Sequence, residues 1–324
     1  MSDALEVSFV PVPAPVPVPA ETSITFTSFR RVEPEGVARI LRSTPCLHRL
    51  CLGLSPANYR EYNGEEEEYV RTIVPALSGL KHLRELDLYQ CNFGHEAILA
   101  LVPALFELKH LHVLSMRGSR FGNHPLEPAD AIAIAPALMG MKDLRELNLQ
   151  TNLLGSEGII ALSPALMEMK NLRELRLSEN EIGPEGALAL APALMGMENI
   201  HYLGLSYNNF GDEGLLAIAQ TFPGMKYLHT LVLRNNEASN SAYHTALTFL
   251  ASNAALTNLY TGLYADKNIE HTQNIMQACQ KNKKFLKKAA FVFNELCLDP
   301  DGHMLSLELG HLIVNEIERI VYTQ

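Results

Sequence analysis

The sequence has little positive charge, few cysteines and no long hydrophobic run. It contains 26 lysines and arginines against 36 aspartates and glutamates, a net charge of −10. It therefore lacks the basic excess that a nucleic-acid binder needs. The five cysteines form no CxxC pair and no cysteine–histidine cluster with zinc spacing, which fits reduced thiols in a cytosol. No window of about 20 apolar residues could cross a bilayer.

The N-terminus lacks the features of a Sec-type signal peptide. It has two acidic residues, no early lysine or arginine, and then a series of prolines. We therefore expect a cytoplasmic protein, or one secreted without a Sec-type signal into a host cytosol. The motifs GxxxxGK followed by serine or threonine, HExxH and GxSxG are also missing. The sequence thus gives little support for an enzyme.

A repeated unit dominates what is present. The segments LRELDL, LRELNL and LRELRL share an LxxLxL motif, whose first residue is numbered position 1 in each repeat. Five of the seven intervals between repeat starts are 28 residues long, and the other two are 36 and 33. A fixed period of this length predicts stacked units of strand, turn and helix. The repeats begin at Leu47, Leu83, Leu111, Leu144, Leu172, Ile200, Leu228 and Leu256.

Each unit changes from a strand pattern to a helix pattern. Leu147 and Leu149 alternate with polar residues, which indicates a strand with one buried face. A helix is expected over about 156–169, and Ser156, Pro184 and Asp212 share a position suited to an N-cap or first turn. Strands of one parallel sheet are predicted at 49–52, 85–88, 113–116, 146–149, 174–177, 202–205, 230–233 and 258–261.

The pattern LxxLxLxxN, followed by two spaced glycines and LxxAL, resembles the ribonuclease-inhibitor-like leucine-rich-repeat family over residues 24 to 264. The resemblance implies an α/β fold, a right-handed leucine-rich-repeat solenoid or horseshoe with one curved parallel sheet and convex helices. It also implies that position 9 carries an inward polar side chain that serves backbone groups of the turn. Four consecutive repeats have asparagine there, namely Asn152, Asn180, Asn208 and Asn236.

Three segments follow from this pattern. Residues 1–22 form a proline-rich arm with a polyproline-II tract at 11–19. Residues 23–264 form the repeat domain, in which a strand at 24–29 and a helix at 37–41 cap eight repeats. Residues 265–324 read as a helical cap, with helices at about 270–282, 284–298 and 305–322. The tract at 299–302 is read as a turn rather than a calcium loop, because the bidentate glutamate is missing.

Prolines and methionines recur at fixed places in the helical stretches. Proline inside a helix removes a hydrogen bond and clashes with the preceding turn, so these helices are expected to be kinked or split. Methionines three residues before a repeat start replace leucine and should be core, whereas a second column should be partly exposed. The prolines are Pro75, Pro103, Pro136, Pro164 and Pro192; the core column is Met141, Met169, Met197 and Met225, and the exposed column is Met139, Met167 and Met195.

Several polar groups invite a chemical interpretation. The residues at position 2 are basic and lie beside the position-3 glutamates. This pattern predicts either a ladder of exposed ion pairs or a basic strip that docks an acidic partner and responds to pH. Cys51, Asp87 and Ser115 are neighbours at position 5, but no histidine shares their row to act as a base. The acidic run 65–68 is read as a solvated loop and first helical turn rather than a docking patch. The position-2 residues are His48, Arg84, His112, Arg145, Arg173, His201 and His229, and the glutamates are Glu85, Glu146 and Glu174.

Aromatic and cationic residues at outward strand positions give the strongest indication of binding, because tyrosine and arginine supply most hot-spot energy in protein interfaces. We therefore expect a non-enzymatic module that holds a partner protein on the concave face, without cofactor or metal, as a monomer. The candidate partner-binding residues are Tyr89, Arg117, Arg176, Tyr202, Tyr207, Arg234 and Tyr260.

The resemblance keeps further functions open. The family includes effectors of intracellular bacteria, so the protein could be an effector of the Legionella type that binds a host protein. It also includes GTPase-activating proteins, for which Arg117 and Arg176 are the candidate stabilising residues. In a third alternative the C-terminal helices carry the activity and the repeats select the target.

Overall fold

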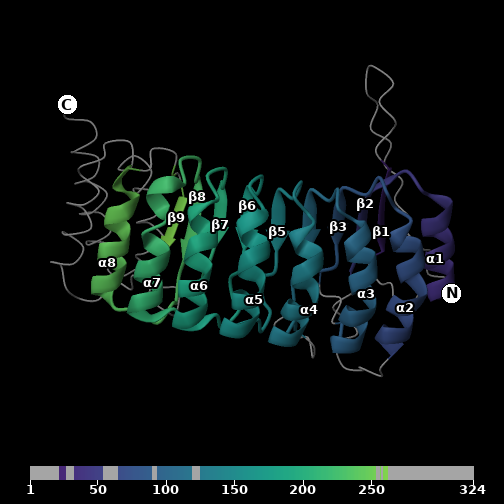
Figure 1. Cartoon of the computed structure of the whole chain (residues 1–324), viewed down its shortest axis with the longest axis horizontal. Helices are drawn as coiled ribbons and strands as arrows, with labels where there is room; N and C mark the ends of the chain where they lie inside the picture. The colour runs from purple at the N-terminus through teal and green to yellow at the C-terminus, as the bar shows by residue number, and fades with distance from the viewer. Residues whose placement is uncertain are drawn as a thin grey trace, which may run out of the picture. The chain divides into compact units, whose positions relative to one another are not determined.

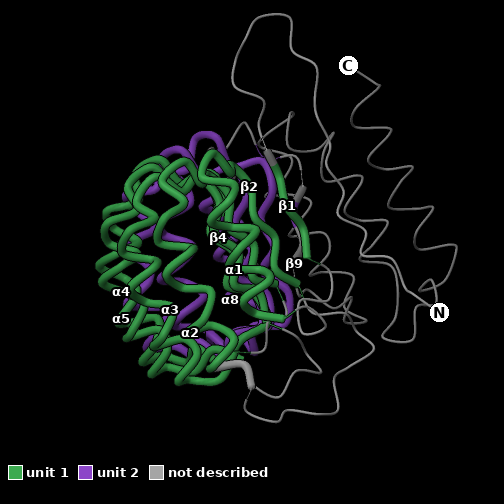
Figure 2. The backbone as a smooth tube through the Cα atoms, turned by 90° about the vertical axis from the view of Figure 1, so that its right-hand side faces the viewer, with its two compact units in different colours: residues 1–174 green, residues 175–324 purple. Residues whose placement is uncertain are grey.

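The structure is a computed structural model that describes residues 22–26, 33–53, 65–89, 93–118, 125–252, 256 and 258–261. Strands and helices alternate along the chain (Figure 1). The strands follow one another in chain order from β1 to β9 in the sheet, and the strand pairs are parallel. The predicted α/β class with a parallel sheet is confirmed. The chain forms two compact units, residues 1–174 and 175–324, shown in green and purple in Figure 2.

The first unit contains an N-terminal strand and helix followed by repeats. Helices lie on one face of its strands (Figure 2), and the strand β6 (Glu174–Arg176) begins at its last residue. Its elements are β1 (Thr22–Phe26), α1 (Pro34–Ser43), β2 (Leu47–Leu52), α2 (Glu65–Ser78), β3 (Glu85–Asp87), α3 (His95–Glu107), β4 (Val113–Ser115), α4 (Pro128–Met139), β5 (Glu146–Asn148) and α5 (Gly155–Glu168).

The second unit repeats the same alternation. Its two last helices are each followed by a short 3₁₀ helix. Its elements are the rest of β6, α6 (Gly183–Met195), β7 (Tyr202–Gly204), α7 (Gly211–Ala219), η3 (Phe222–Gly224), β8 (Thr230–Leu233), α8 (Asn240–Thr248), η4 (Phe249–Ser252) and β9 (Asn258–Thr261).

The strand register places equal repeat positions side by side. Arg49 pairs with Glu85, Glu85 with Val113, and Val113 with Glu146, all at position 3. In the second unit Tyr202 pairs with Thr230 in the same way. The sequence rows therefore correspond to rows on the sheet. The position-4 leucines from Leu50 to Leu231 are fully buried, so positions 3 and 5 face the other side, here called the sheet face.

Methionines divide between core and surface as expected. The column that replaces leucine is buried, with exposed fractions of 0% to 2%. The second column is exposed by 44% at Met139, 38% at Met167 and 62% at Met195. Both predictions are confirmed.

The helices do not split at their internal prolines. Each of α2 to α6 runs through its proline as one helix, so the split that was expected as an alternative to a kink is wrong. The prolines and the residues four positions earlier, such as Pro164 and Ile160, are exposed. The carbonyl that loses its helical donor therefore lies on the solvent side, where water can satisfy it.

The helix starts agree with the first-turn alternative of the prediction. α5 begins at Gly155 after Leu154, whose side chain makes no capping hydrogen bond, so Ser156 is a first-turn residue and not the N-cap. Asp212 is also in a first turn, and its carboxylate accepts hydrogen bonds from the backbone N–H and hydroxyl of Ser239, the N-cap of α8. These two hydrogen bonds thus join the acidic first turn of α7 to the N-cap of α8.

Other predictions concern residues outside the described part of the chain. These are the polyproline tract at 11–19, the tract at 299–302 and the helices expected at 270–282, 284–298 and 305–322. The acidic run 65–68 opens α2, in agreement with the first-turn interpretation. Among the described helices, none has the length and apolar character needed to cross a bilayer.

Candidate functional site

A ladder of buried asparagines fixes the edge where the strands of the second unit end. The Asn208 side chain donates to the carbonyls of Leu177 and Leu205 at 2.9 and 3.0 Å. Its Oδ1 accepts the backbone N–H of Asn180 at 3.0 Å. Asn236 repeats this arrangement one repeat later, accepting from the Asn208 N–H at 3.0 Å. The predicted role of position 9 in serving the turn is thus confirmed for these residues.

The ladder ends on a tyrosine. The backbone N–H of Asn236 donates to the hydroxyl of Tyr243 at 3.1 Å, and this hydroxyl donates to the carbonyl of Leu233 at 2.9 Å. Tyr243 lies in α8 and is 2% exposed. The next repeat has Tyr264 at position 9 instead of asparagine, and the Tyr243 hydroxyl supplies the missing polar group from the helix.

The turn that follows each strand corrects part of the site prediction. Tyr89, Arg117, Tyr207 and Arg234 lie beyond the ends of β3, β4, β7 and β8, so they are turn residues and not strand residues. By Tyr207 the backbone has left the extended conformation, since this residue has a φ of 56°. The side chain of Tyr207 is 45% exposed. Carbonyl oxygens at position 6 accept hydrogen bonds from asparagine side-chain amides, and the strands do not continue beyond this position.

Two predicted residues are brought together on the sheet face of the second unit. The guanidinium carbon of Arg176 in β6 lies 4.1 Å from the ring centroid of Tyr202 in β7, in cation–π geometry. Both side chains are half-buried. Gly204 leaves room for this ring, since a Cβ there would lie 3.1 Å from it and 3.2 Å from Ser178 Oγ. The Tyr202 ring therefore lies against the space that a side chain at Gly204 would occupy.

Three rings stack beside this pair at the strand-start end. The His201 ring lies 5.3 Å from that of His229 and 6.0 Å from that of Tyr227, in stacked orientation. Tyr227 is 53% exposed and was missed by the sequence analysis, because it precedes position 1 and falls outside the strand rows. Tyr227 lies one residue before the repeat start, and this position could have indicated from the sequence that its side chain lies next to position 2. We call Arg176, Tyr202, His201, Tyr227 and His229 the aromatic–cationic surface.

The sheet face of the first unit is more polar. Arg49 forms an ion pair with Glu85 on the adjacent strand, and both side chains are partly exposed. The ring of Tyr89 lies against Gly53, the equivalent residue of the previous repeat. Arg117 is exposed in the turn after β4. Exposed ion pairs of this kind contribute little to stability. This pair joins two position-3 residues, so it is not one of the pairs between position 2 and position 3 that the ladder interpretation predicted.

The position-5 row of the first unit has Cys51, Asp87 and Ser115 on adjacent strands, as predicted. The Cys51 thiol lies 3.9 Å from Asp87 Oδ2. Burial, followed by the negative charge of Asp87 and the hydrogen bond to it, raises the pKa of Cys51 to about 11. The thiol is therefore protonated at neutral pH, and thiolate chemistry is disfavoured at this position.

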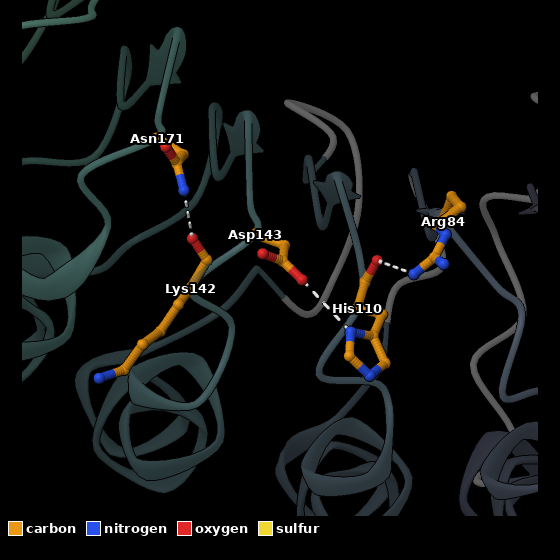
Figure 3. A network of polar contacts seen from close by, with 5 residues as sticks. All are labelled: Arg84, His110, Lys142, Asp143 and Asn171. Carbon is orange, nitrogen blue, oxygen red and sulfur yellow. Dashed lines mark hydrogen bonds and ion pairs between the residues drawn. The ribbon is translucent and has the colours of Figure 1, made fainter.

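The strand-start edge of the first unit joins successive repeats through polar contacts (Figure 3). Arg84 donates to the carbonyl of His110 at 3.0 Å, His110 Nδ1 lies 3.2 Å from Asp143, and Asn171 donates to the carbonyl of Lys142 at 3.1 Å. In the same row, burial and then the charges of Arg145 and Arg84 lower the pKa of His112. His112 is thus neutral at neutral pH, which weakens the basic-strip interpretation at that position.

Two further predicted residues, Arg234 and Tyr260, lie in or just after the last strands of the second unit. Arg234 follows β8 and is half-buried, with its backbone N–H bonded to Ser206 Oγ at 2.9 Å. Tyr260 lies in β9 and pairs with Val232. Within the described ranges, no three histidine, cysteine, aspartate or glutamate side chains are grouped to hold a metal ion.

Comparison with known proteins identifies the repeats. A family described as "Leucine Rich repeat" matches residues 141–163, 168–191 and 196–219. Each segment covers a strand, the turn after it and most or all of the following helix of a regular 28-residue unit. No curated protein sequence matches the chain. The prediction of leucine-rich repeats is confirmed.

Three solved structures are similar to this chain at low sequence identity. They are the leiomodin-1 actin-binding site 2, the Arabidopsis receptor kinase HAESA and the C-terminal domain of tropomodulin from Caenorhabditis elegans. The identities are 15%, 17% and 14%, and the TM-scores are 0.40, 0.44 and 0.39. The matches cover 52%, 74% and 51% of this chain and 95%, 33% and 98% of the other chains. This chain thus spans a third of the HAESA chain.

Proposed function

We propose that the protein is a non-enzymatic interaction module that binds a partner protein through the aromatic–cationic surface of its second unit. The observation that carries this proposal is the Arg176–Tyr202 stack. It places a cation and an aromatic ring in contact on the sheet face, while the structural leucines of the same strands point to the other side. Arginine and tyrosine in a fixed arrangement are the residue types that dominate protein–protein hot spots.

The proposed surface is preorganised before any partner binds. Tyr202 is held between Arg176 and Gly204, and the stacked rings of His201 and His229 follow on the adjoining strand starts. Side chains that are already ordered lose less conformational entropy on binding. A partner with an acidic or carbonyl-rich loop and an apolar residue would match a surface made of guanidinium, imidazole and phenol groups.

The resemblance to effectors of intracellular bacteria makes host-cell proteins the first partners to test. Our experiment captures proteins from a eukaryotic lysate on the purified chain, purifies the captured partner and measures its dissociation constant. The double variant Arg176→Ala with Tyr202→Ala is expected to weaken this binding roughly thirtyfold, since two hot-spot losses together reach about 2 kcal/mol or more. Circular dichroism of the variant should match that of the parent, because neither side chain is part of the core.

A matched control uses exposed residues on the helices of the same unit. Glu185→Ala with Glu213→Ala should leave the dissociation constant within about twofold. If this control removes binding while the double variant does not, the partner contacts the helices and the proposed site is wrong. A captured GTP-binding protein whose hydrolysis rate falls with Arg176→Ala would instead support the GTPase-regulating alternative.

A further inference from the structure

The helices of the first unit carry an exposed apolar surface that the sheet-face site does not use. α3, α4 and α5 pack side by side (Figure 1). On each helix three outward residues are apolar at spacings of four and three, so they lie on one face. We call these nine residues the apolar plate: Leu99, Pro103 and Phe106 on α3, Ile132, Pro136 and Met139 on α4, and Ile160, Pro164 and Met167 on α5.

The plate is regular, and the same apolar spacing recurs on α6 of the second unit with exposed Leu188, Pro192 and Met195. The large side chains of the plate are exposed by 38% to 54%. On α2 the equivalent positions on either side of Pro75 are the exposed Arg71 and the half-buried Ser78, so the apolar stripe begins only at α3. Scattered surface leucines need no explanation, but three aligned rows form a contiguous patch.

Charged residues border the plate on opposite edges. The N-terminal ends of the three helices present exposed Glu96, Glu127 and Glu157. The C-terminal ends present exposed lysines, each three residues after the last apolar position of its helix, as Lys170 follows Met167. The lysines that follow the three helices are Lys109, Lys142 and Lys170, and Lys81, which follows α2 and pairs with Glu107 of α3, extends this edge.

The lysine edge also contains three acids, each bonded to a basic side chain of the same edge. Lys81 pairs with Glu107 at 2.7 Å, Lys142 with Glu168 at 3.5 Å, and His110 with Asp143 at 3.2 Å. Four lysines against these three acids keep the edge basic in net. Figure 3 shows the Lys142 side chain directed away from the polar network, which it joins only through its carbonyl. The plate therefore has a basic and an acidic side.

We infer that the apolar plate is a self-association surface that binds a second copy of this chain, in place of the monomer expected from the sequence. A two-fold axis that lies in the plate and runs across the helices places each helix antiparallel to its own copy. The lysine edge of one copy then faces the glutamate edge of the other, for example Lys170 opposite Glu157. The other in-plane axis, along the helices, would oppose lysine to lysine and glutamate to glutamate. The charge pattern thus selects one isologous arrangement.

The size of the surface fits a dimer. With three helices about 10 Å apart and two turns of stripe on each, the apolar part of the plate covers roughly 300 Å². The charged edges extend it toward the roughly 800 Å² per partner of a standard interface. A lipid surface fits less well, because an anionic membrane would be repelled by the acidic edge.

The test is sedimentation equilibrium of the full chain from low to high micromolar concentration. The parent chain is expected to show a monomer–dimer equilibrium, and Ile132→Glu with Ile160→Glu should raise the dimer dissociation constant at least about thirtyfold. Lys170→Glu should weaken the dimer by placing two glutamates together, and adding Glu157→Lys should restore it. The pair Glu35→Lys with Arg42→Glu on α1, which makes the same exchange of charges away from the plate, should have no effect.

Three results would overturn the inference. The parent chain could remain monomeric at every concentration, or its dimer could be unaffected by the two glutamates in the plate. The Lys170→Glu and Glu157→Lys substitutions could each weaken the dimer without restoring it in combination, which would exclude the antiparallel arrangement. Cosedimentation of a monomeric chain with phosphatidylserine vesicles, lost in the Ile132→Glu and Ile160→Glu variant, would assign the plate to membranes instead. The sheet-face site does not depend on any of these outcomes.

Discussion

Replacing Asn208 with leucine is expected to lower the free energy of unfolding by roughly 2–4 kcal/mol. The substitution removes the acceptor of the buried Asn180 N–H and one donor to each of two carbonyls, those of Leu177 and Leu205. The carbonyls keep a second asparagine donor each, from Asn180 and Asn236. The orphaned N–H therefore dominates the loss, and leucine offers it no partner.

Urea unfolding followed by circular dichroism measures this loss. Glu198→Gln, on an exposed loop of the same unit, serves as the control and should change the free energy by no more than about 0.5 kcal/mol. Tyr243→Phe should also destabilise, because the Asn236 N–H then loses the hydroxyl that ends the ladder. If Asn208→Leu unfolds at the same urea concentration as the parent chain, the ladder is not what holds the turns.

Replacing Gly118 with alanine is expected to cost about 2–3 kcal/mol of stability in the first unit. A Cβ at this position would overlap the carbonyl oxygen of Thr151 and lie 2.6 Å from Asn152 Oδ1. The obstacle is backbone of the next repeat, and the Asn152 oxygen is itself occupied by the Leu126 N–H at 2.9 Å. Neither group can move without breaking turn hydrogen bonds.

The same substitution at Gly140 should have the opposite sign. Gly140 has a φ of −80°, and a Cβ there meets nothing closer than 3.4 Å. Alanine reduces the freedom of the unfolded chain and should be neutral or stabilising by up to about 1 kcal/mol. Thermal unfolding of both variants checks the pair. Equal thermal midpoints for the two variants would show that the backbone around Gly118 can move apart to accommodate a Cβ at little cost.

The repeat rows could be predicted from the sequence because parallel strands keep equal positions side by side. The spacing of 28 residues was enough to place Tyr202 next to Thr230 and to bury the column that includes Met169. The Asn208 ladder followed from four asparagines at one position. These features depend on periodicity, which a sequence shows directly.

Side-chain packing and the bending of the turns could not be predicted in the same way. The contact of Arg176 with Tyr202 depends on Gly204 being empty beside it, and the stack of Tyr227 on His201 crosses from a loop to a strand. The apolar plate depends on which helix positions stay exposed after stacking. Proline in a helix suggested a break, whereas the exposure of the affected carbonyls allows continuity.

Site-specific photo-crosslinking tests the central claim most directly. Thr230 lies opposite Tyr202 on the sheet face, so a benzoylphenylalanine at position 230 should crosslink the captured partner. The same probe at Glu213, on the helix side of this unit, should not. Excess parent chain should suppress the adduct, whereas excess Arg176→Ala with Tyr202→Ala should not. An adduct from position 213 with none from position 230 would contradict the assignment of the binding surface.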